Sequence, residues 1–205
     1  MNIKIPNYLI DAYNNELILG IIQFGSSIYN KTSKDIDVAV VVKEGKFSAF
    51  VDFIKNKKIN KLWDISLIKE EEICYDNFFF GNHGIYLIEA FKYGNTLLGI
   101  NPFINLPKHS EFDIKNSVYE RLKEYLYILR KRYFKNGNNN EQFSRRYFKF
   151  LKLSAYLLDD KIKYPEVMRM SLDVIYEILE KKGLKLTENR SENMEIIWEN
   201  LRKQY

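Results

Sequence analysis

The chain has 205 residues, of which 46% are hydrophobic and 29% are charged, so it is long and apolar enough to bury a core and not typical of a disordered chain. No apolar run approaches the ~18 to 20 residues that span a bilayer, and the N-terminal segment lacks the features of a signal peptide. We therefore expect a cytoplasmic protein with no membrane partner. The single cysteine, Cys74, excludes an internal disulfide and gives little support to a cysteine-based metal site.

The net charge of +5 is unevenly distributed along the chain. Residues 1–106 carry 11 lysines, no arginine and 12 acidic residues, a net charge of −1. Residues 107–205 carry 13 lysines, 8 arginines and 15 acidic residues, a net charge of +6. Such asymmetry is typical of a protein in which one half acts on a metal or phosphate while the other faces a nucleic acid or a nucleoside triphosphate. A lysine-rich solvated helical surface is the alternative.

The first half of the sequence alternates strand and helix patterns. The apolar run LILGIIQF, residues 17–24, ends at a glycine and predicts a buried strand. We predict further strands along residues 35–42 and 62–68, and helices along residues 47–59 and 84–98. The segment GINPFINLPKHS, with its two prolines, marks a boundary. The order strand, strand, helix, strand predicts a small mixed sheet with flanking helices.

After this boundary the hydrophobic pattern is helical throughout. We predict four helices, along residues 118–133, 143–157, 168–182 and 192–204. Gly183 is the expected stop of the third. The fold class is therefore predicted as α+β, with a mixed-sheet domain over residues 1–106 and a helical bundle over residues 107–205.

Two carboxylates alternate within the second predicted strand. Asp35 and Asp37 are separated by one residue, and strand side chains alternate between faces, so both should point the same way. Their repulsion is costly unless a proton or a divalent cation compensates for it. Asp64, on the third predicted strand, joins the pair if the two strands are neighbours. Three carboxylates at one end of a small sheet would suit Mg²⁺ or Mn²⁺, which also bind phosphate oxygens.

A glycine-serine element, "FGSS", follows the first predicted strand. Gly25 allows the backbone to pass close to a ligand, and Ser26 offers a hydroxyl and an amide to a phosphate. Ser27 fits a ligand contact and a simple loop residue equally well. The sequence thus predicts a phosphate-binding element beside a metal site.

Together these residues resemble the polymerase β-like nucleotidyltransferase superfamily. Its motif is an apolar strand, Gly-Ser, a polar loop, Asp-x-Asp on the next strand and a third Asp on a later strand. Here these elements are "FGSS", "KDIDVAV" and "LWDISLI". The resemblance extends over residues 17–106, and the loop is similar to those of small stand-alone nucleotidyltransferases. Lys34 stands where a serine commonly precedes the first Asp.

The resemblance implies a role for each motif residue. Asp35 and Asp37 would bind both metal ions, while Asp64 would help bind one and assist deprotonation of the attacking hydroxyl. The NTP, expected to be ATP, would be held by residues of both halves: Gly25, Ser26, Ser27, Arg145 and Lys149. The implied cofactor is Mg²⁺ or Mn²⁺. The implied fold of the first half is that of a nucleotidyltransferase domain.

The basic second half favours a tRNA or other RNA as the acceptor hydroxyl. A protein side chain and a small molecule such as an aminoglycoside are the alternatives, the latter making the protein an aminoglycoside-type adenylyltransferase. A catalytically inactive nucleotide-binding or antitoxin-like protein is the alternative outside the enzyme class, and Lys34 is compatible with it. A partner protein or a second copy of the chain is a further expected contact.

The basic residues of the second half cluster around the loop NGNNN. They interleave with tyrosines and phenylalanines that are expected to serve mainly as core residues, and the basic set comprises Arg130, Lys131, Arg132, Lys135, Arg145, Arg146, Lys149 and Lys152. Such a face fits a triphosphate, an RNA acceptor or a solubilising surface. His83 and His109 have no second histidine at metal-ligand spacing, so we interpret both as structural.

Overall fold

The structure is a computed structural model, and it describes residues 3–29, 35–73, 84–137, 141–164 and 166–205. Lys34, Cys74 and His83 lie outside these residues. The chain forms two compact units, residues 1–109 and 110–205, where the sequence suggested a boundary after residue 106. Within the described residues, no helix combines the length and the hydrophobicity needed to cross a bilayer.

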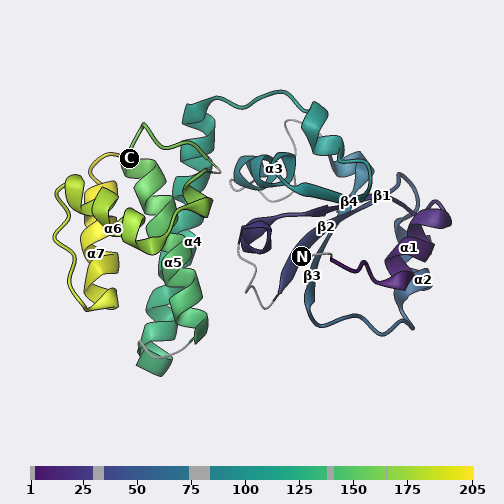
Figure 1. The fold of residues 1–205 in the computed structure, drawn as a ribbon, viewed down its shortest axis with the longest axis horizontal. Coiled ribbons are helices and arrows are strands. Elements are labelled where there is room, and N and C mark those ends of the chain that lie inside the picture. Colours follow the sequence, from purple (N-terminus) through teal and green to yellow (C-terminus); the bar gives the residue numbers. More distant parts are fainter. Residues whose placement is uncertain (1–2, 30–34, 74–83, 138–140, 165) are drawn as a thin grey trace. The chain divides into compact units, whose positions relative to one another are not determined.

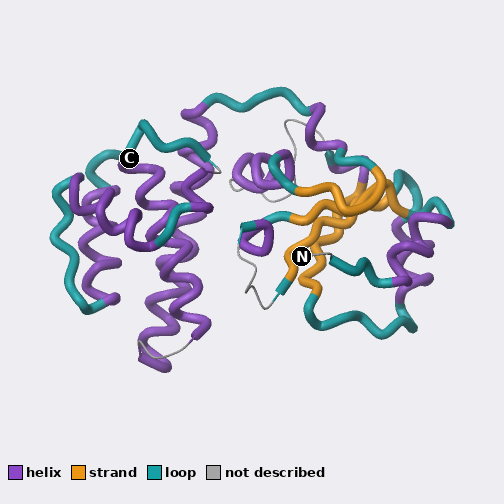
Figure 2. The backbone as a smooth tube through the Cα atoms, viewed as in Figure 1, coloured by secondary structure: helices purple, strands orange, loops and turns teal. Residues whose placement is uncertain are grey.

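The first unit is built on a mixed four-stranded sheet with the strand order β3-β2-β1-β4 (Figures 1 and 2). β1 (Ile18–Gln23) is antiparallel to both β2 (Ile36–Val42) and β4 (Asn95–Gly99). β2 is parallel to β3 (Trp63–Lys69), its other neighbour. The three predicted strands are confirmed, as is the α+β fold class.

Helices cover both faces of the sheet. α1 (Asn7–Asn14) and α2 (Phe47–Ile54) pack on one face, against a core that includes Val38, Val40 and Val42. α3 (Gly84–Lys92) packs on the other face (Figure 1). The core on that side includes Ile88 and Phe91 of α3 together with Ile22, Ala39, Val41 and Ile68 of the sheet. The alternation of the apolar residues of β2 between these cores explains why the strand is hydrophobic on both sides. Short 3-10 turns follow β1, β3 and β4: η1 (Gly25–Ile28), η2 (Glu70–Glu72) and η4 (Pro102–Asn105).

The predicted helix along residues 84–98 is wrong in its second part. α3 ends at Lys92, and the residues after Gly94 form β4. A Cβ atom at Gly94 would lie 2.5 Å from Ile22 Cγ2 and 2.6 Å from the Gln23 carbonyl oxygen, so the chain turns tightly against β1 there. The short apolar run that follows fits a strand and a helix equally well by pattern, and its pairing with β1 decides between them. α2 also ends before residue 59, and α1 was not predicted.

The second unit is helical, which confirms the four predicted helices: α4 (Glu111–Asn136), α5 (Glu141–Leu158), α6 (Leu172–Lys181) and α7 (Arg190–Leu201), with η6 (Glu166–Arg169) before α6. Ser110, Ser171 and Asn189 accept hydrogen bonds from backbone amides as N-caps of α4, α6 and α7. Gly183 has φ +85° just after α6, in the left-handed region typical of a helix stop.

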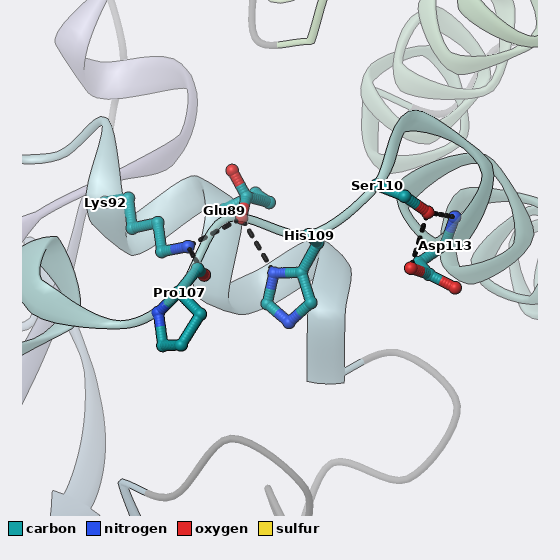
Figure 3. Close-up of polar contacts among 6 residues, drawn as sticks. All are labelled: Glu89, Lys92, Pro107, His109, Ser110 and Asp113. Atoms are coloured by element: carbon teal, nitrogen blue, oxygen red, sulfur yellow. Dashed lines mark hydrogen bonds and ion pairs between the residues drawn. The ribbon is translucent and has the colours of Figure 1, made fainter.

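A buried polar network anchors the end of the first unit (Figure 3). Glu89 of α3 accepts hydrogen bonds from Lys92 Nζ at 3.0 Å and pairs with His109 Nδ1 at 2.8 Å. Lys92 also donates to the Pro107 carbonyl oxygen at 2.7 Å. Only 8% of the Glu89 side chain and 3% of the His109 side chain are exposed, so His109 has the structural role expected of it. The next residue, Ser110, caps α4 by accepting from the Asp113 amide at 3.1 Å.

Replacing Glu89 should destabilise the first unit. Glu89→Ala would leave His109 and Lys92 buried without their shared carboxylate, at an expected cost of about 2–4 kcal/mol. Urea denaturation of the variant and of the unaltered chain measures this cost. Glu71→Ala, an exposed position in η2, is the matched control. Equal stability of the two variants would contradict a supporting role for the network.

Candidate active site

The strand register brings two of the three predicted carboxylates side by side. Asp37 of β2 is the direct partner of Asp64 of β3 in the parallel pair. Val41 and Ile68, four residues further along each strand, pack against α3, so alternation puts both carboxylates on the α3 side of the sheet. Neighbouring parallel strands lie about 4.8 Å apart, which leaves the two carboxylates within reach of one ion. Asp35 lies one residue before β2 and, like Asp37, is half-buried, while Asp64 is exposed.

Gly25 lies directly against the Asp37 carboxylate. A Cβ atom on Gly25 would be 2.5 Å from Asp37 Oδ2 and 3.1 Å from its carboxyl carbon. Gly25 also has φ +73°, a conformation that L side chains rarely adopt. The Phe24 amide donates to the Asp37 carbonyl oxygen at 3.0 Å, which fixes the start of η1 to β2. The glycine of "FGSS" and the second acid of "DID" therefore form one structural element.

Ser27 helps to hold the η1 turn. Its hydroxyl accepts from Gln23 Nε2 at 3.0 Å and donates to the Phe24 carbonyl oxygen at 3.4 Å. Gln23 is only 3% exposed, and its Oε1 accepts from Asn95 of β4 at 3.4 Å. Gln23 thus links β4 to the turn, a role that sequence reasoning missed. The signal was present as a single amide at the end of the apolar run LILGIIQF. Ser26 lies in η1 beside Gly25.

The chemistry of these residues fits a divalent cation. Asp37 and Asp64 supply hard oxygen donors in register, and the absence of a side chain on Gly25 makes room for the Asp37 carboxylate itself. In the described part of the chain, no three His, Cys, Asp or Glu side chains are already arranged as a metal site. Like charges held on neighbouring strands repel, so a cation would be needed to draw the carboxylates of the triad together. Asp35, Asp37 and Asp64 are the residues that would hold it.

The predicted triphosphate-binding cations belong to the second unit. Arg145 and Lys149 both lie on α5, one turn apart. Arg145 is exposed and pairs with Glu141 at 3.4 Å, while Lys149 is half-buried. Beside them, burial lowers the pKa of Arg146, and the nearby positive charges of Arg132 and Arg121 lower it further. Positive charge is therefore concentrated between α4 and α5.

Comparison with known proteins finds one informative likeness. No protein-family model matches the chain, and no curated protein matches it. Among solved structures, the chain is similar to the spectinomycin adenyltransferase AAD(9) from Enterococcus faecialis, whose crystal structure contains ATP and spectinomycin. The match covers 97% of this chain and 100% of that chain, with a TM-score of 0.57 and 14% sequence identity. The chain has the fold of that adenyltransferase. This fold consists of a mixed sheet domain followed by helices.

Filling the space at Gly25 should displace the Asp37 carboxylate. We expect Gly25→Ala to weaken Mg²⁺ binding and to cost about 1–2 kcal/mol in stability, because the φ of +73° is strained for alanine and the new methyl meets Asp37 Oδ2. Gly45→Ala is a close control, since Gly45 has φ +68° but nothing within 4 Å of an added Cβ. Denaturation and Mg²⁺ calorimetry separate the two effects. If both variants bound Mg²⁺ equally well, the placement of Asp37 by Gly25 would be refuted.

Proposed function

We propose that the chain is a metal-dependent nucleotidyltransferase that moves a nucleoside monophosphate, with ATP as the expected donor, to an acceptor hydroxyl. The observation that carries the proposal is the register of Asp37 with Asp64, with Gly25 packed on the Asp37 carboxylate. The likeness of fold to an adenyltransferase supports it. Two carboxylates in register on one face of the sheet supply hard oxygen donors for a divalent cation, and that cation would also bind the phosphates of the substrate.

The proposed nucleotidyl transfer would use the three carboxylates as ligands of a cation. A divalent cation bound by Asp35, Asp37 and Asp64 would neutralise the phosphate charge that develops during transfer. The acceptor oxygen attacks the α-phosphorus, a new O–P bond forms, and the bond from the α-phosphorus to the bridging oxygen of the departing pyrophosphate breaks. Asp64, exposed beside Asp37, would take the proton of the attacking hydroxyl. Gly25 and the turn that Ser27 holds would receive the phosphates.

Two acceptor classes are each favoured by one observation. The +6 charge of residues 107–205 favours an RNA end, because phosphate contacts dominate nucleic-acid affinity. The likeness to a spectinomycin adenyltransferase favours a small aminocyclitol or aminoglycoside hydroxyl instead. The two classes are separated by supplying both with α-labelled ATP and Mg²⁺ and finding which acquires the label.

Removal of either paired carboxylate should abolish transfer. Asp37→Asn and Asp64→Asn are each expected to lower the initial rate by at least about 100-fold, because metal and positioning supply most of the catalysis. The measurement is incorporation of label from α-labelled ATP into total RNA and, separately, into spectinomycin. Asp52→Asn is the control, since Asp52 lies exposed on α2 and pairs with Lys55. Undiminished transfer by the Asp37 variant would refute the mechanism.

Asp64→Asn, although it should lower the transfer rate, should not lower the stability of the metal-free protein. Without metal, Asp64→Asn removes a negative charge beside Asp37, so its melting temperature should equal or exceed that of the unaltered chain. Added Mg²⁺ should raise the melting temperature of the unaltered chain and leave that of the variant unchanged. Thermal melting with and without Mg²⁺ measures both shifts. A Mg²⁺ shift of equal size in the two proteins would place the cation elsewhere.

A further inference from the structure

The C-terminal part of α4 carries positive charge without a compensating acid in its own sequence. From Tyr125 to Lys135 the helix contains four basic residues and no acidic residue. One of the four, Arg130, is engaged by Glu195 of α7, with its Nε 2.8 Å from the carboxylate. Within the described residues, no ion pair is formed by the other three, which are Lys131, Arg132 and Lys135. The charge of this segment is therefore available to an external anion.

Aromatic side chains border these cations on the same helix. Tyr127 and Phe134 are 67% and 91% exposed. Positions 127, 131 and 134 follow helical spacing, so Tyr127, Lys131 and Phe134 share a face of α4. Lys135 lies one turn after Lys131, and both lysines are exposed. We refer to Tyr127, Lys131, Phe134 and Lys135 as the α4 surface.

The positive charge continues from the α4 surface towards α5. Arg132 lies near Arg146, whose guanidinium contacts the Tyr125 ring at 6.0 Å from its centroid. The Arg121 guanidinium also lies over the Tyr125 ring, 4.8 Å from its centroid, and pairs with Glu124. Within the described residues, neither Arg132 nor Arg146 forms an ion pair with a carboxylate. Placing these like charges together costs free energy that a bound polyanion would recover.

We propose that the α4 surface, together with Arg132 and Arg146, binds single-stranded RNA. Exposed aromatic rings offer platforms on which unpaired bases stack, and the flanking cations track the phosphates between them. A free triphosphate would use the cations and leave Tyr127 and Phe134 exposed to water. An RNA duplex would keep its bases stacked within the helix and would contact the cations alone.

This inference deepens the proposed function, because the bound RNA would be the acceptor, but RNA binding can be measured without transfer. The full chain is titrated into a fluorescein-labelled single-stranded oligouridine of about 12 nucleotides, within the range of site sizes of single-strand binders. Fluorescence anisotropy is recorded in EDTA, without ATP, over a series of salt concentrations. Under these conditions the carboxylates of the catalytic site have no cation and no nucleotide to act on.

Two sets of variants separate stacking from charge. Tyr127→Ala and Phe134→Ala should each weaken binding about 5- to 150-fold, the loss expected for one stacked base. The double variant Lys131→Gln/Lys135→Gln should reduce the slope of log affinity against log salt by about 1.4, from two phosphate contacts on a single strand. The matched controls are Phe112→Ala, 71% exposed in the acidic first turn of the same helix, and Lys185→Gln/Lys203→Gln, at exposed lysines elsewhere in the second unit.

The outcomes are distinguishable. Loss of affinity in the α4 variants with unchanged controls supports the inference, provided that circular dichroism shows intact helices. No binding by the full chain, or equal losses in the controls, would overturn it. Losses confined to the lysine variant would indicate a general polyanion surface and would overturn the assignment to single-stranded RNA, as would equal competition by duplex RNA or by free ATP. Transfer to a small molecule without RNA binding would overturn this inference and leave the proposed function standing. RNA binding without any transfer would overturn the proposed function and leave this inference standing.

Discussion

Two carboxylates of like charge stand in register on neighbouring parallel strands, and the first unit is organised around keeping them there. Asp37 and Asp64 cannot separate along the sheet, because the pairing of β2 with β3 continues in unbroken register from Ile36 to Val42. Asp37 is also fixed to the turn, because Gly25 packs on its carboxylate and the Phe24 amide donates to its backbone oxygen. The apolar residues of β2, buried on both faces, hold this strand between the two helical layers.

The second unit has the opposite electrostatic character. Its cations gather on the C-terminal part of α4 and the start of α5, where Arg132 and Arg146 approach each other around Tyr125. In the proposed nucleotidyl transfer, the acidic site of the first unit would bind a cation with its phosphates, and the basic surface of the second unit would bind a larger anion. Much of the positive charge of the second half of the sequence therefore lies on two helices, α4 and α5.

Local pattern was sufficient to predict the elements that hold most of the candidate site. Strand periodicity placed Asp37 on β2, whereas Asp35, predicted on the same strand, lies one residue before it. The glycine before Ser26 marked the turn that the structure shows at Gly25. Pattern could not show that Asp64 is the direct partner of Asp37, because the register of two strands far apart in sequence depends on packing across the whole sheet. It failed at β4 for a related reason, since pairing with β1 converts an ambiguous apolar run into a strand. Gln23 was missed because its role consists of contacts to Ser27 and Asn95, which have no periodic signature.

The anchored segment before α4 has a practical consequence for dissecting the protein. Pro107 and His109 are both hydrogen-bonded to α3, and Ser110 already caps α4, so each of these three residues is held by one of the two units. A protease needs several residues of unfolded backbone to enter its active site, so this junction should be a poor site for limited proteolysis. Separate expression of the first unit would have to retain His109, because a chain that ended at residue 106 would leave Glu89 buried without one of its two partners.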